Sequence, residues 1–197
     1  TVLVVDAKFT RVANDYKAGE RGAMFYGVLM DTKGNVLANK VVQIAVNGPI
    51  YNVTTDSDGR AGLQVNLAHA NVYTYALFFQ GDDTYKASLL ASSKLKIYKK
   101  STALSASNKE FKASAEKVIK VTLKTSKNPY DGKTYMKKGK KITLKINGKT
   151  YAAKTNKKGV VKFTIELSKK GTYKAKIAFA GDKTYEACAK TISVKIK

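Results

Sequence analysis

The second half of the chain repeats the first half at a constant offset of 100 residues, and this repeat limits what the chain can fold into. The segment VNGPIYNVTTDSDG at 46–59 aligns with INGKTYAAKTNKKG at 146–159, and no gap is needed between positions 41 and 88. A repeat of this length has the size of a whole domain, whereas solenoid repeats run to about 20–50 residues. We therefore expect two copies of one domain, at 1–98 and 99–197, with a short linker at 98–101.

Short runs with an apolar residue at every second position recur in each copy. In the second copy one run carries Ile142, Leu144 and Ile146, and another carries Ala175 and Ile177. Such alternation indicates strands with one buried face. Six or seven short strands per copy, separated by turn signals, are typical of a sandwich of two sheets. The sequence therefore predicts an all-β chain of two tandem immunoglobulin-like β-sandwich domains.

Several residues that recur in both copies are interpreted as structural. The glycines suit turns that need a positive φ, and each Gly-Asp pair is expected to turn the chain between the last two strands. The tyrosines stand where a sandwich places its tyrosine corner, in which the hydroxyl bonds to the chain upstream. The residues in this set are Gly59, Gly159, Tyr73, Tyr173, Gly81, Asp82, Gly181 and Asp182.

These shared residues form a pattern of NG-x-x-Y, then T-x-x-x-G, then L-x5-Y-x5-F-x-G-D-x-x-Y. The pattern resembles the Ig-like (Big-type) repeats of large bacterial and archaeal surface proteins, and it is similar to those of adhesin-like proteins of methanogenic archaea. The resemblance is strongest over 41–97 and 141–196. It implies an extracellular stalk or adhesin segment, located at a cell surface or cell wall, that belongs to a larger exported protein and adjoins neighbouring repeats of the same parent chain.

The chain offers few residues for catalysis or metal binding. It contains one histidine, His69, and one cysteine, Cys188. His69 falls in an expected loop, where the second copy has Lys169, so we expect neither a catalytic triad nor a zinc site. The sequence DSDG at 56–59 resembles the start of a calcium loop but lacks the later ligands, and we expect a plain turn. No enzymatic activity, cofactor or metal is predicted, and no local signature marks a Lys–Asn or Lys–Asp isopeptide bond.

Asn52-Val53-Thr54 is an N-glycosylation sequon, which matters only if the protein is exported. A chance occurrence in a threonine-rich strand is the alternative. No apolar run approaches the length of a membrane helix, so we expect no membrane insertion in this segment.

The net charge of +23 is divided unevenly between the copies. Residues 1–100 carry 12 basic and 8 acidic side chains, a net charge of +4, whereas residues 101–197 carry 25 and 6, a net charge of +19. Strand alternation predicts that several lysines of the second copy point outward from one sheet. These candidate ligand-binding residues are Lys141, Lys145, Lys174, Lys176 and Lys195.

Two interpretations of this predicted lysine-rich face stay open. It could bind an anionic partner, such as a cell-surface or cell-wall polysaccharide or a host-surface ligand. It could also serve only solubility and protection of sheet edges. A general polyanion-binding or nucleic-acid-binding module is the alternative function. Nucleic acid is the less favoured partner because the second copy has no arginine and no aromatic strip between its lysines.

Most of the corresponding outward positions of the first copy are apolar, the exceptions being Gln43 and Thr74. Val41, Ala45 and Phe78 are expected to form a strip that contacts a neighbouring domain or a partner. A strand register shifted by one residue would instead bury these side chains, and this is the competing explanation.

Overall fold

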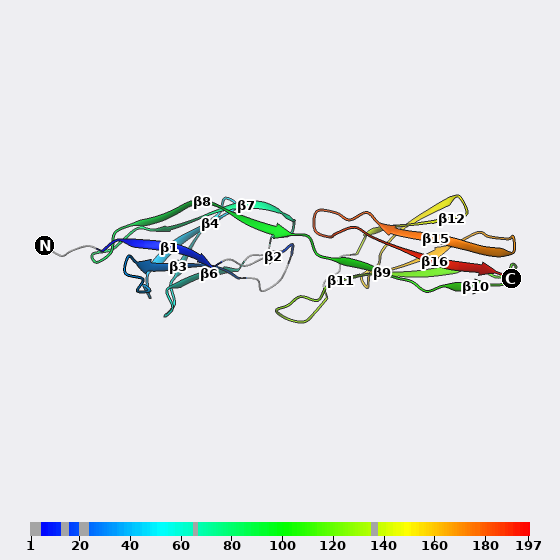
Figure 1. Cartoon of the computed structure of the whole chain (residues 1–197), viewed down its shortest axis with the longest axis horizontal. Coiled ribbons are helices and arrows are strands. Elements are labelled where there is room, and N and C mark those ends of the chain that lie inside the picture. Colours follow the sequence, from blue (N-terminus) through cyan, green and yellow to red (C-terminus); the bar gives the residue numbers. More distant parts are fainter. Residues whose placement is uncertain (1–4, 13–15, 20–23, 65–66, 135–137) are drawn as a thin grey trace. The chain divides into compact units, whose positions relative to one another are not determined.

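The computed structural model describes residues 5–12, 16–19, 24–64, 67–134 and 138–197, and in these ranges it contains strands and no helix (Figure 1). Its contacts divide the chain into two compact units, Thr1–Tyr98 and Lys99–Lys197. Each unit is a β-sandwich, so the predicted fold class is confirmed. In the described part of the chain, no helix long and apolar enough to cross a membrane is found.

Unit 1 pairs a three-stranded sheet with a five-stranded sheet. The three-stranded sheet has the order β1-β3-β6, and the five-stranded sheet has the order β2-β8-β7-β4-β5. The strands of unit 1 are β1 Ala7–Val12, β2 Tyr16–Lys17, β3 Met24–Asp31, β4 Val41–Val46, β5 Ile50–Thr54, β6 Arg60–Gln64, β7 Asn71–Phe79 and β8 Ser88–Tyr98.

Unit 2 repeats this arrangement strand for strand. Its three-stranded sheet has the order β14-β11-β9, and its five-stranded sheet has the order β10-β16-β15-β12-β13. The strands of unit 2 are β9 Thr102–Ser105, β10 Lys109–Phe111, β11 Val118–Thr125, β12 Lys141–Ile146, β13 Lys149–Lys154, β14 Val160–Thr164, β15 Gly171–Phe179 and β16 Cys188–Ile196.

Each described unit has eight strands, where the sequence indicated six or seven. The difference arises because the first strand of each sandwich breaks and passes from one sheet to the other. In unit 2, β9 pairs antiparallel with β11, and β10 then pairs parallel with β16. Asn108 lies in the break, and its Oδ1 accepts the backbone N–H of Ser193 at 2.9 Å. A strand as short as β10 is below the length at which alternation can be recognised.

The core of each unit lies between its two sheets and follows the predicted alternation. In β12, Ile142, Leu144 and Ile146 are buried while Lys141 and Lys145 are exposed. Each fully buried Leu or Ile side chain contributes about 1.5–3 kcal/mol of hydrophobic stabilisation. Burial of these alternate residues fixes which side of each strand faces the core, and the remaining side chains therefore project from the outer face of the sheet.

The Asn-Gly pairs form the tight turns that their sequence suggests. Asn147 and Gly148 both have positive φ values, 46° and 73°, and they connect β12 to β13 with Ile146 opposite Lys149. Two successive residues with positive φ are the signature of a type I′ turn, whose twist matches that of the strands it joins. The turn therefore sets the register between β12 and β13.

The two repeated tyrosines bond to the chain upstream. The Tyr73 hydroxyl donates to the carbonyl oxygen of His69 at 2.9 Å, and the Tyr173 hydroxyl donates to that of Lys169 at 2.8 Å. This is the geometry of a tyrosine corner. The repeated glycines, Gly59, Gly81, Gly159 and Gly181, all have positive φ values, between 68° and 88°.

Candidate ligand-binding surface

The outer face of the five-stranded sheet of unit 2 carries a cluster of lysines. Lys145 on β12 lies opposite Lys176 on β15, and Lys141 lies opposite Lys154 on β13. Cross-strand partners of an antiparallel pair project from the same face. Lys174 and Lys195 lie further along this face on β15 and β16. We call this set the lysine face: Lys141, Lys145, Lys154, Lys174, Lys176 and Lys195, all of them exposed.

The structure brings the five predicted lysines onto one surface and adds Lys154. Sequence reasoning missed Lys154, although a signal was present. The Asn147-Gly148 turn implies a tight hairpin with Ile146 opposite Lys149. Pairing the residues outward from that turn places Lys154 opposite Lys141.

The ion pairs of unit 2 involve other lysines than those of the lysine face, although Glu110 on β10 lies opposite Lys195. Among the described residues of unit 2, the ion pairs are Lys140–Asp182, Lys149–Glu166 and Lys197–Glu110, and no member of the lysine face takes part in them. Like charges directly opposite each other on a sheet are destabilising. An anion bound over this face would relieve the repulsion within the two lysine pairs.

The same face of unit 1 has a different character. A row of cross-strand partners runs from Leu89 on β8 through Phe78 on β7 and Gln43 on β4 to Asn52 on β5. Val41, Ile50 and Leu89 on this face are exposed by 61%, 66% and 61%. The predicted positions Val41, Ala45 and Phe78 therefore belong to the outer face, and Ile50 and Leu89, which the sequence did not single out, extend it.

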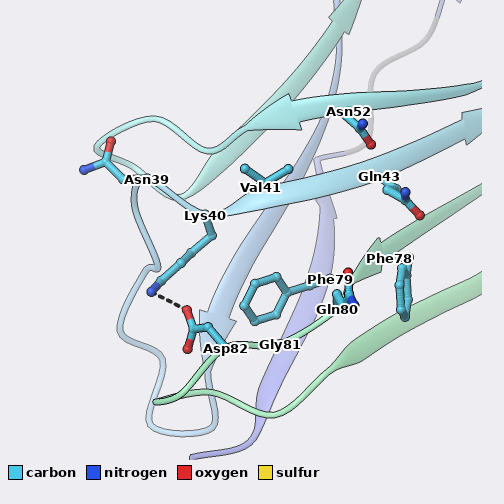
Figure 2. A pocket seen from close by; sticks show the side chains of 10 residues that line it. All are labelled: Asn39, Lys40, Val41, Gln43, Asn52, Phe78, Phe79, Gln80, Gly81 and Asp82. Atoms are coloured by element: carbon cyan, nitrogen blue, oxygen red, sulfur yellow. Dashed lines mark hydrogen bonds and ion pairs between the residues drawn. The ribbon is translucent and has the colours of Figure 1, made fainter.

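A surface hollow opens at the same place in both units. It lies where β4 begins and β7 ends in unit 1, and where β12 begins and β15 ends in unit 2, beside the Gly-Asp turn. The hollow of unit 1 has a volume of about 410 Å³ and is lined by Asn39, Lys40, Val41, Gln43, Asn52, Phe78, Phe79, Gln80, Gly81 and Asp82 (Figure 2). That of unit 2 has a volume of about 490 Å³ and is lined by Gly139, Lys140, Lys141, Thr143, Ala178, Phe179, Ala180, Gly181 and Asp182. Every lining position of the second hollow has its counterpart 100 residues earlier in the first.

An ion pair closes one end of each hollow. Lys40 Nζ lies 2.6 Å from Asp82 Oδ2, and Lys140 Nζ lies 2.5 Å from Asp182 Oδ2. Each ammonium also lies over a tyrosine ring, 5.0 Å from the Tyr85 centroid in unit 1 and 4.9 Å from its counterpart's centroid in unit 2. Sequence reasoning marked the aspartates but missed both lysines, although Lys40 and Lys140 also recur at the offset of 100.

The aspartate of each pair is held as a carboxylate. The hydrogen bond from Lys40 lowers the pKa of Asp82, and the backbone N–H groups of Thr84 and Tyr85 lower it further. For Asp182, burial favours the neutral form, but the bonds from Lys140 and from two backbone N–H groups outweigh it and lower the pKa.

The lowered pKa of Asp182 predicts a loss of stability in acid. Because the unfolded carboxyl group has the usual pKa of 3.8 and the folded one lies lower, the unfolded chain takes up the proton first as the pH falls. The stabilisation is therefore complete above roughly pH 5 and is lost as the pH falls through the folded pKa.

We expect Asp182→Asn to lower the free energy of unfolding of unit 2 by about 1 kcal/mol at neutral pH and to reduce the dependence of that free energy on pH in acid. Urea unfolding between neutral and acid pH measures both effects, and the intact Lys40–Asp82 pair of unit 1 is the internal control. An unchanged acid slope in unit 2 would contradict the assignment.

The other residues considered for chemistry lie apart from the hollows. Asp56 Oδ1 accepts the backbone N–H groups of Asp58 and Arg60, each at 2.9 Å, so this carboxylate organises its own turn. His69 is exposed in the loop before β7. Within the described ranges, no three His, Cys, Asp or Glu side chains come together as a metal site would require.

The sequon residue Asn52 is exposed on β5 and lines the hollow of unit 1. A glycan attached to its amide nitrogen would therefore begin at this hollow. In unit 2 the equivalent residue is Ala152, so the sequon has no counterpart there.

Comparison of the sequence with protein-family models and with curated proteins gave no match. Solved structures do match. The crystal structure of invasin, described as a bacterial integrin-binding protein, aligns with a TM-score of 0.58 at 15% identity, over 96% of this chain and 39% of that one. A two-domain fibronectin type III segment of chicken tenascin aligns with a TM-score of 0.45 at 14% identity, over 94% and 97% of the two chains. The adhesin InvE of Yersinia pseudotuberculosis aligns with a TM-score of 0.39 at 10% identity, over 97% and 58%. At 15% identity the likeness to invasin is one of fold alone.

Proposed function

We propose that this chain is a non-catalytic adhesion module of a cell-surface protein, and that unit 2 binds an anionic polysaccharide through its lysine face. The observation that carries the proposal is the set of six exposed lysines on one sheet face, with Lys145 opposite Lys176 and Lys141 opposite Lys154. The chain spans only 39% of the length of the invasin structure. We also propose that it forms part of a longer extracellular protein.

The physical basis of the proposed binding is the summed field of the lysine face. Each lysine is a solvated point charge on a flexible stem, which suits carboxylate or sulfate groups spaced along a polymer better than one fixed anion. At physiological salt, charges further apart than about 8 Å are screened, so only an anion lying on the face gains much attraction. An extended polyanion lying across β13, β12, β15 and β16 would contact several of these lysines at once.

We also propose that the chain acts as a stalk that spaces other parts of the protein, and the fold supports this role. Each sandwich has its own hydrophobic core, Leu144 and Ile177 being fully buried in unit 2 and Ile44 and Leu77 in unit 1. A domain with its own core keeps its shape in a row of similar domains. We propose that neighbouring repeats of this type, similar to those of methanogen surface proteins, continue the parent chain on either side.

The test is to change Lys141, Lys145, Lys174 and Lys176 to glutamine together. Each lysine near an anionic surface contributes about 1 kcal/mol, so we expect binding to heparin and to polygalacturonate to weaken by about a hundredfold or more at physiological salt. Surface plasmon resonance over a salt series measures the affinity and its salt dependence.

A matched control separates this face from net charge alone. The three-stranded sheet of unit 2 also exposes Lys120, Lys124 and Lys162, and Lys157 lies in a turn. Changing these four to glutamine alters the net charge equally and is expected to weaken binding by less than about tenfold. Equal losses in the two variants would mean that the charge is diffuse and the lysine face is no site. Preferential binding of an oligonucleotide, with dependence on its sequence, would favour the nucleic-acid alternative instead.

A further inference from the structure

The two hollows share one backbone frame but differ in the side chains that line them. In both units an aspartate-lysine pair closes one end, and Phe79 or Phe179 forms the buried base. The replacements between unit 1 and unit 2 are Asn39 to Gly139, Val41 to Lys141, Gln43 to Thr143, Asn52 to Ala152, Phe78 to Ala178 and Gln80 to Ala180. Unit 1 thus has an aromatic ring and four amides where unit 2 has small residues and one lysine.

Three of the four amides of the unit 1 hollow are available to a ligand on the outer face of the sheet. Gln43, Asn52 and Gln80 are exposed, and their side chains form no hydrogen bond to another group of the described chain. Each amide offers two donor hydrogens and one acceptor oxygen. Figure 2 shows Asn52, Gln43 and Phe78 at one end of the hollow, with Val41 between them and the Lys40–Asp82 pair at the other. The outward side chains of three neighbouring strands therefore converge on one small area.

The hollow of unit 1 also lacks an uncompensated charge. Lys40 and Asp82 neutralise each other at 2.6 Å, and every other lining residue is uncharged. A charged ligand would gain little here, whereas the lysine face of unit 2 offers charge and few apolar side chains. The volume of about 410 Å³ is within the usual range for small-molecule sites.

We propose that the hollow of unit 1 binds a sugar ring of an uncharged glycan. A pyranose ring has an apolar face of C–H groups, which packs on the negative face of an aromatic ring such as Phe78. Its hydroxyl groups, which both donate and accept, match the amides of Gln43, Asn52 and Gln80. This site goes beyond the proposed function and uses only unit 1, so the failure of the lysine face would leave it standing.

The sequon at Asn52 affects how the site must be tested. If Asn52 carries a glycan in the native protein, its first sugar lies at the hollow and competes with a ligand from outside. The full chain should therefore be produced in a bacterial cytosol, where no N-glycan is attached. The probe is an array of uncharged gluco-, manno-, galacto- and N-acetylglucosamine oligosaccharides at millimolar concentration.

Titration followed by ¹⁵N NMR tests the proposal directly. We expect one probe class to shift the side-chain amide signals of Gln43, Asn52 and Gln80 in a saturable way, with no matching shifts in unit 2. Phe78→Ala is expected to lower the affinity about tenfold, the usual scale for the loss of an aromatic contact. Leu89→Ala, in the same cross-strand row but outside the hollow, is the control and is expected to leave the affinity unchanged.

A second variant and the other possible titration results also test the sugar site of unit 1. If Phe78→Ala disturbs the fold, Gln43→Ala on the exposed face replaces it, with a loss of affinity expected and an unchanged affinity overturning the proposal. The absence of shifts with all probe classes overturns it as well. Amide shifts that follow protein concentration instead of sugar concentration would mean that the hollow docks a second copy of the chain. Grafting Ala178→Phe, Thr143→Gln, Ala152→Asn and Ala180→Gln into unit 2 is expected to create the same binding there.

Discussion

Leu144→Ala is expected to lower the free energy of unfolding of unit 2 by about 2–5 kcal/mol, the largest effect among the substitutions considered for this chain. Leu144 is fully buried on β12, which lies between β13 and β15, and its cross-strand partner on β15 is Ile177. Truncation removes apolar contact area and leaves a cavity that a strand hydrogen bonded on both sides closes only in part. Urea unfolding followed by circular dichroism measures the loss.

The same variant tests whether the two units fold separately, which we propose from their separate cores. We expect the unfolding transition of unit 2 to move to lower denaturant, while that of unit 1 stays in place. Thr143→Ala, on the outward side of the same strand, is the control and is expected to cost less than about 1 kcal/mol. A single transition that moves as a whole, or equal movement of two, would mean that the units unfold together.

Gly181→Ala is expected to destabilise unit 2 by about 2–4 kcal/mol. Gly181 has a φ of +78°, and a Cβ atom there would lie 2.8 Å from the backbone nitrogen of Ala187 and 3.0 Å from the carbonyl oxygen of Tyr185. Left-handed backbone costs a non-glycine residue about 1–2 kcal/mol, and the contact with rigid backbone adds to this cost. Because Asp182 follows directly, the change is also expected to disturb the Lys140–Asp182 pair.

Gly148→Ala separates the two causes. Gly148 also has a positive φ, 73°, but a Cβ atom there would meet nothing within 4 Å. We therefore expect only the conformational cost, about 1 kcal/mol. Thermal unfolding of both variants gives the comparison, and equal losses would show that the crowding around Gly181 has no effect.

The outward positions of the lysines could be predicted because alternation is a local property. Once Ile142 and Leu144 are assigned to the core, Lys141 and Lys145 must point the other way, whatever the rest of the chain does. The same reasoning placed Val41 and Phe78 outward. Turns were also readable, since Asn147-Gly148 carries the residues that a type I′ turn requires.

The pairing between strands could not be predicted in this way. That Lys145 faces Lys176, or that Phe78, Gln43 and Asn52 form one row, depends on the hydrogen-bonded register of strands distant in sequence. Alternation excludes registers that differ by one residue, because such a shift would turn the core side chains outward, but it allows shifts by two residues. Where the loop between two strands is long, the loop does not select among these allowed registers. The ion pair between Lys40 and Asp82 joins residues 42 apart, and only the recurrence of both residues in the second copy hinted at it.

The sequence by itself determined the two-copy organisation, the β-sandwich class, the buried side of each main strand and the uneven charge. The two-copy organisation follows from the repeat along the chain, and the other properties follow from composition, from the period of two and from turn residues, which act over a few neighbouring residues. The tertiary structure decided the strand switch at Asn108, the register that gathers six lysines on one face, and the two hollows beside the Gly-Asp turns. Those features arise where distant strands meet, because the two sheets must bury one core between them and the packing of that core selects which residues lie side by side.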